Sequence, residues 1–113
     1  MPINKINTRR LNEYKEVFGT QKLRFLWNEY LEQSSQNWQK LNAADWETKR
    51  QMFHNWRSAS QVFGMDDFAR ICQTIEDKIL KRHFEKLEQK IVDSREIYEQ
   101  SIGDVGIIFL QME

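Results

Sequence analysis

Apolar residues recur at steps of three and four along most of the chain, and this spacing predicts amphipathic helices. A short leading helix is predicted, with Leu11, Tyr14 and Phe18 on its apolar side. Gly19 is expected to end it, and Thr20 to cap the next helix. The residues expected to face inward from that second, longer helix are Leu23, Trp27, Tyr30, Leu31, Ser34, Trp38 and Leu41.

Three more helical patterns follow. The segment 42–45 interrupts the second helix, and Asp45 is expected to be the N-cap of the third. Gly64 is expected to end the third helix, and Asp66 or Asp67 to start the fourth. The residues expected to face inward are Trp46, Phe53, Trp56, Ser60 and Phe63 in the third helix, Phe68, Ile71, Cys72, Ile75 and Ile79 in the fourth, and Phe84, Leu87, Ile91, Ser94 and Tyr98 in the fifth.

Short connections make successive helices antiparallel neighbours. We therefore predict an all-α fold, an up-and-down antiparallel four-helix bundle with a short N-terminal lid helix, in a single domain over residues 1–113. The bundle is expected at about residues 20–102, with the junction before the fifth helix at residues 81–84. Residues 103–113 form a predicted tail, because two glycines separate the last helix from the apolar run 107–110. We expect this tail to dock on the bundle or on another copy of the chain.

Composition supports a helical fold, since 113 residues include four glycines and one proline. Lys plus Arg and Asp plus Glu number 17 each, so the overall charge gives no footprint for nucleic acid. Cys72 has no partner for an internal disulfide, which suits a reducing cytoplasm. The polar N-terminal stretch lacks the features of a signal peptide. No apolar run approaches the ~18 residues that a membrane span needs. We expect a cytoplasmic protein without a nucleic-acid or membrane partner.

His54 falls on a polar face of the third helix. Residues three, four and seven positions further on share a helix face, and for this histidine they are Arg57, Ser58 and Gln61. The apolar stripe of the same helix lies about 100° away, so the imidazole is expected to be presented to solvent. Arg57 can place a permanent cation beside an anion held on the ring, and residues 48–65 contain no acid. The alternative is a surface histidine without a function.

The stretch HNWRSASQVFGMDDFARICQTIE, which starts at His54, resembles the signature of histidine-containing phosphotransfer (HPt) domains. In that family His-x-Leu-Lys-Gly-x-Ala/Ser leads to a glycine, then an apolar residue, and ends in an apolar-Glu or apolar-Gln pair. His54 matches the phosphoacceptor, Arg57 replaces the lysine and Ser58 the glycine. The resemblance covers about residues 11–100, and the positions that fall in register are Ser60, Gly64, Phe68, Cys72, Ile75 and Glu76.

The resemblance implies an intermediate of a multistep two-component phosphorelay. His54 would take a phosphoryl group from the aspartate of one receiver domain and pass it to another, with neutral imidazole as the nucleophile. Glu76 would hydrogen-bond Nδ1 and so leave Nε2 facing solvent. Arg57 would stabilise the phosphoryl oxygens.

The resemblance also implies the partners, which are response-regulator receiver domains and hybrid sensor kinases. Asn55, Ser58 and Gln61 are expected to face them, and Gln61 to contribute a donor at the site. Because the receiver supplies Mg²⁺, we expect no metal, no cofactor and no ATP site in this chain. We expect a monomer, with the tail leaving association of two copies open.

Particular residues bear on three other interpretations. The main alternative is a degenerate bundle that binds a receiver or another signalling protein without carrying phosphate, and the side chain of Ser58 favours it. A histidine kinase dimerisation helix usually has an acid directly after its histidine and a proline soon afterwards, whereas Asn55 follows here. A metal site would have to use residues whose spacing resembles no zinc motif, namely His54, Cys72, Glu76 and His83.

Overall fold

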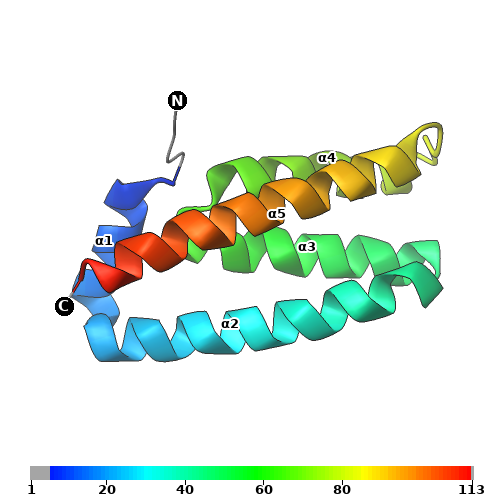
Figure 1. Cartoon of the computed structure of the whole chain (residues 1–113). Helices are drawn as coiled ribbons and strands as arrows, with labels where there is room; N and C mark the ends of the chain where they lie inside the picture. The colour runs from blue at the N-terminus through cyan, green and yellow to red at the C-terminus, as the bar shows by residue number, and fades with distance from the viewer. Residues whose placement is uncertain (1–5, 113) are drawn as a thin grey trace.

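The structure is a computed structural model that describes residues 6–112, and within that range its regular elements are all helical. The elements are α1 (Thr8–Phe18), α2 (Thr20–Lys40), the 3₁₀ turn η1 (Leu41–Ala43), α3 (Trp46–Val62), α4 (Asp66–Leu80) and α5 (Leu87–Leu110). Helices α2 to α5 lie roughly side by side along the length of the molecule (Figure 1). Helix α1, the α3–α4 turn and the C-terminal end of α5 lie at one end of the molecule. The α2–α3 and α4–α5 connections lie at the opposite end (Figure 1). The all-α prediction is confirmed.

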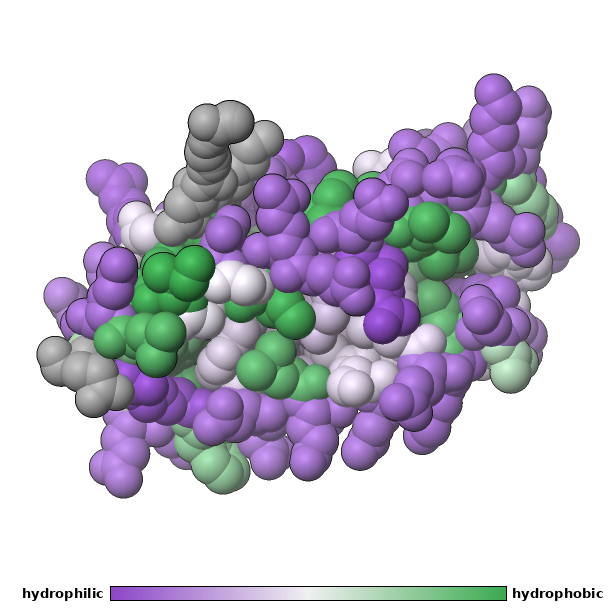
Figure 2. All heavy atoms as spheres, in the orientation of Figure 1, coloured by the Kyte–Doolittle hydropathy of each residue, from purple (hydrophilic) through white to green (hydrophobic). Residues whose placement is uncertain are grey.

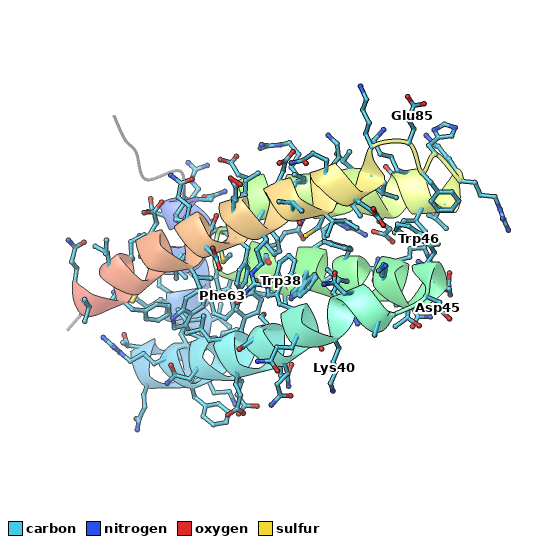
Figure 3. The ribbon with its side chains drawn as sticks, turned by 45° about the vertical axis from the view of Figure 1, so that its right-hand side comes forward. Trp38, Lys40, Asp45, Trp46, Phe63 and Glu85 are labelled. Carbon is cyan, nitrogen blue, oxygen red and sulfur yellow. The ribbon has the colours of Figure 1, made fainter. Side chains whose placement is uncertain are left out.

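Aromatic rings fill the interior between α2 and the helices that it faces. The rings of Trp38 on α2 and Trp56 on α3 stack with their centroids 4.2 Å apart. The ring of Trp27 lies 4.9 Å from that of Phe63 and 5.7 Å from that of Phe109 on α5. Trp38 and Phe63 can be seen in this interior in Figure 3. These contacts join α2 to both α3 and α5. Each aromatic pair stabilises the fold by about 0.5–1.5 kcal/mol in addition to the contribution of its buried area.

Three serines lie on the predicted apolar faces, and the structure buries Ser34, Ser60 and Ser94. Ser60 on α3 and Tyr30 on α2 share a buried hydrogen bond of 2.8 Å between their hydroxyl oxygens. Burial raises the pKa of the Tyr30 phenol well above its usual value, so the hydroxyl keeps its proton. Small hydroxyl side chains therefore leave room for large rings while their polar atoms find partners.

Most residues that were predicted to face inward are buried. Tyr14, Leu31, Trp46, Ile71 and Ile91 are partly buried, and Phe18 is 40% exposed. The placement of Phe84 in the fifth helix was wrong. Helix α5 begins at Leu87, and Phe84 lies in the connection before it, 39% exposed, with its ring centroid 5.0 Å from that of Trp46. The connection between α4 and α5 therefore covers residues 81–86, whereas residues 81–84 were predicted.

The predicted helix starts were partly right. Asp45 is the N-cap of α3, and its carboxylate accepts a 2.8 Å hydrogen bond from the backbone N–H of Thr48. Thr20 is not a cap, because Gly19 occupies the N-cap position of α2 and Thr20 is the first helical residue. Gly19 has a positive φ of 84°, a conformation that glycine adopts at little cost.

Asp66 is the first residue of α4, as predicted, and its carboxylate holds α1 in place. It accepts hydrogen bonds from Nδ2 of Asn7 at 3.0 Å and from Nη1 of Arg10 at 2.7 Å. The backbone N–H of Asn7 also donates to the carbonyl oxygen of Gly64 at 2.8 Å. Gly64 has φ 74°, and a Cβ at this position would collide with the carbonyl of Asn7. The α3–α4 turn is therefore the docking point of α1.

The predicted tail was wrong, because α5 continues through Gly103 and Gly106 to Leu110. A glycine within a helix costs about 1 kcal/mol relative to alanine, which is less than the burial of one large apolar side chain contributes. Val105 and Phe109 are buried and provide that contribution. Of the expected docking residues, Phe109 is buried and Ile108 partly buried, whereas Ile107 and Leu110 are 54% and 73% exposed.

The face shown in Figure 2 is mostly polar, with apolar side chains gathered over the C-terminal part of α5 and between α5 and α2. The large apolar residues that remain exposed include Val17, Phe25, Val92, Ile107 and Leu110. Over residues 6–112, no helix is both long enough and apolar enough to traverse a lipid bilayer.

Candidate functional site

His54 lies near the middle of α3, and its side chain is 48% exposed. Its neighbours on the apolar stripe, Phe53 and Trp56, are buried. The histidine is thus presented to solvent at one edge of the α3–α4 pair, as the sequence pattern predicted.

Glu76 projects from α4 toward this histidine. It follows Ile75, which is fully buried, and the Glu76 side chain itself is only 9% exposed. Its Oε2 lies 2.9 Å from Nδ1 of His54, which confirms the predicted contact. Because an ionised carboxylate can only accept, this hydrogen bond places the ring proton on Nδ1. Nε2 then carries the lone pair and is the nitrogen able to attack an electrophile.

Two arginines of α3 flank the same carboxylate. Nη1 of Arg50 lies 3.5 Å from Oε2 of Glu76, and Nε of Arg57 lies 3.4 Å from Oε1. A buried carboxylate is tolerated when it is paired, and these two guanidinium groups provide the pairing. Nη2 of Arg57 also lies 3.1 Å from Nδ1 of His54. Since Nδ1 donates to Glu76, the contacts with Glu76 rather than the ring hold Arg57 there.

Arg50 makes a second, closer ion pair with Glu47, one helical turn before it. Its Nε and Nη2 donate to the two carboxylate oxygens at 3.0 and 2.7 Å, and Gln51 Nε2 donates to the same carboxylate at 3.3 Å. These hydrogen bonds hold the pKa of Glu47 below, and that of Arg50 above, its ordinary value. Arg50 was not among the predicted site residues. Its position four residues before His54, on the same helix face, is the signal that could have found it.

A shallow hollow of about 300 Å³ opens beside the imidazole. The residues that line it are Arg50, Gln51, His54 and Asn55. Of the predicted partner-facing residues, Asn55 and Ser58 are exposed on α3 close to the histidine. Gln61 is also exposed but lines a separate hollow with Arg10 and Asp66, so its predicted donor role at the histidine is not supported.

No group of three or more His, Cys, Asp or Glu side chains that could hold a metal ion occurs among residues 6–112. Cys72 is fully buried in the core, and His83 lies in the exposed α4–α5 connection. The site itself consists of one oriented imidazole beside two cations and a buried carboxylate. Comparisons with protein-family models, with curated proteins and with solved structures found no match to this chain.

Proposed function

We propose that the chain is a histidine phosphotransfer protein of a multistep two-component phosphorelay. His54 accepts a phosphoryl group from the aspartyl phosphate of one receiver domain and delivers it to another. The observation that carries this proposal is the 2.9 Å contact between Nδ1 of His54 and the buried Glu76 carboxylate on a half-exposed ring. A carboxylate behind the ring is the kind of partner that orients catalytic histidines.

The transfer needs little beyond positioning and charge stabilisation. The Nε2 lone pair attacks phosphorus, the bond from phosphorus to the aspartate oxygen breaks, and the carboxylate leaves with that electron pair. The ring becomes positively charged while it still holds the proton on Nδ1, and the adjacent Glu76 carboxylate stabilises this charge. The reverse sequence loads the next receiver. The receivers would supply Mg²⁺, so the chain's own part is to orient the ring and hold the charges.

The arrangement of the helices agrees with this function. We propose that α2 to α5 form an up-and-down antiparallel four-helix bundle with α1 as its lid, the architecture that the HPt resemblance implies. The connections alternate between the two ends of the molecule (Figure 1), and α1 is tied to the α3–α4 turn through Asp66. This turn follows the helix that carries His54, so the lid steadies the element on which the site is built.

The second candidate is an adaptor that binds a receiver through the same face without accepting phosphate. Ser58 favours it, because the side chain is exposed where the family pattern has glycine and a partner approaches closely. Incubation with a phosphorylated receiver distinguishes the two functions. A carrier acquires phosphate that is labile in acid and stable in alkali, whereas an adaptor binds and remains unlabelled.

A further inference from the structure

We propose that Arg50, together with Gln51 and Asn55, forms the subsite that holds the phosphoryl group on Nε2 of His54. This inference rests on the proposed function and changes the role of Arg57, which the family resemblance would make the phosphoryl-binding cation. The ligand is a tetrahedral oxyanion bonded to the ring nitrogen, and the subsite is the hollow that these residues line with His54.

Arg57 is turned toward the wrong nitrogen for that task. Its Nε is buried and lies 3.4 Å from Oε1 of Glu76, and its Nη2 lies 3.1 Å from Nδ1 of His54. Nδ1 is the nitrogen that faces the protein, whereas the phosphoryl group would sit on Nε2. Arg57 is therefore a positioning residue that pairs with Glu76 behind the ring.

Arg50 is placed to meet the phosphoryl group. It lies one turn before His54 on the same face of α3 and lines the open hollow with the imidazole. Guanidinium binds phosphoryl oxygens through two parallel N–H groups, which makes arginine well suited to this ligand. The amides of Gln51 and Asn55, both exposed at the hollow, can add neutral donors.

Glu47 and Glu76 both pair with the Arg50 guanidinium, Glu76 at 3.5 Å from Nη1 and Glu47 more closely, at 2.7 Å from Nη2. Two hydrogen bonds of 2.7 and 3.0 Å hold Arg50 on a carboxylate that is 63% exposed. A phosphoryl group carries more negative charge than a carboxylate, and an exposed glutamate returns to water at little cost. Arrival of the phosphoryl group would therefore draw Arg50 from Glu47. This competition would keep the phosphoryl group from being bound so tightly that it could not leave for the next receiver.

The experiment uses phosphoramidate as the phosphoryl donor, so that no cognate receiver is needed. Its P–N bond breaks, the bond from phosphorus to Nε2 forms, and ammonia leaves. The rate of labelling and the lifetime of phosphohistidine are measured by ³¹P NMR for the wild-type chain and for Arg50→Gln, Arg50→Lys, Arg57→Gln and Glu47→Gln. Circular dichroism checks that each variant is folded.

Arg50→Gln should lower the labelling rate or the phosphohistidine lifetime about tenfold, as expected for loss of a charge-assisted hydrogen bond. Arg50→Lys should recover part of the loss, and Arg57→Gln should have a smaller effect than Arg50→Gln. Glu47→Gln should act in the opposite direction and lengthen the lifetime, an effect that a merely structural role of Arg50 would not produce.

Two results would overturn the inference in distinguishable ways. If the wild-type chain is labelled on His54 and Arg50→Gln behaves like it, or Arg57→Gln is the more damaging change, the subsite assignment is wrong and the phosphotransfer function stands. If the wild-type chain acquires no label on His54, the proposed function and the inference fail together.

Discussion

Nδ1 of His54 on α3 lies 2.9 Å from Oε2 of Glu76 on α4, a residue 22 positions further along the chain. The contact joins a half-exposed ring to a side chain that is 9% exposed. It fixes the ring orientation and its tautomer from the protein side, and it leaves Nε2 available on the solvent side.

Replacing Glu76 should slow phosphotransfer without abolishing partner binding. Glu76→Ala removes the acceptor for Nδ1, and loss of such an orienting partner typically costs about 10–100-fold in activity. Glu76→Gln should be milder, because the amide oxygen still accepts the Nδ1 hydrogen bond although the charge is gone. Transfer rates from a phosphorylated receiver, with binding measured in parallel by calorimetry, test this. Transfer at the wild-type rate in Glu76→Ala would remove Glu76 from the site.

Gly64→Ala should destabilise the fold by loosening α1. A non-glycine residue in the left-handed region costs about 1–2 kcal/mol, and the collision of the new Cβ with Asn7 adds about 1–3 kcal/mol. Gly19→Ala is a control without a collision, because Gly19 has positive φ and a ψ of 157° but open space around it, and it should show a backbone cost alone. Denaturant unfolding measures both, and hydrogen exchange should be faster in α1 of Gly64→Ala. Hydrogen exchange in α1 of Gly64→Ala that is no faster than in Gly19→Ala would contradict the docking described here.

Gly103→Ala and Gly106→Ala should each stabilise the chain by about 0.5–1 kcal/mol. Both glycines lie within α5, neither has positive φ, and a Cβ would meet nothing within 4 Å at either position. Alanine lowers the entropy of the unfolded chain and fits the helix. Chemical denaturation provides the measurement. A loss of stability in both variants would mean that the glycines interrupt the helix, as the sequence pattern had predicted.

Cys72 should resist thiol reagents in the native protein. Its side chain is fully buried, and burial raises the pKa of the thiol well above its usual range, which removes the reactive thiolate. Reaction with a chromogenic disulfide reagent should be slow in buffer and complete in denaturant. Rapid labelling under native conditions would indicate that the α4 face opens frequently.

The helical pattern was predictable because the apolar steps of three and four are long and regular in α2 to α4. The end of α5 was not, since local glycine propensity at positions 103 and 106 pointed to a break whereas tertiary burial of Val105 and Phe109 decided the outcome. Helix starts were predicted where a side chain caps its own helix, as Asp45 does. The start of α4 at Asp66 was also predicted, but not that its carboxylate bonds to α1.

Part of the candidate site was predicted, from the spacing of residues on one helix face and from the family resemblance. The face through His54 and Arg57 follows from spacing, and Glu76 followed from the HPt pattern. Arg50 was missed because it lies one turn before the histidine, whereas the HPt pattern begins at the histidine. No rule of sequence spacing shows that both arginines converge on Glu76, because that depends on how α3 and α4 pack.

Phosphorylation of His54 is the measurement that tests the central claim most directly. The purified chain is incubated with a phosphorylated receiver domain or with phosphoramidate, and the phosphorylated residue is identified by its acid lability, its alkali stability and mass spectrometry. His54→Gln should abolish the label with an unchanged circular dichroism spectrum, whereas His83→Gln, at an exposed position in the α4–α5 connection, should keep it. Label that persists in His54→Gln, or a wild-type chain that stays unlabelled while it binds receivers, would contradict the account.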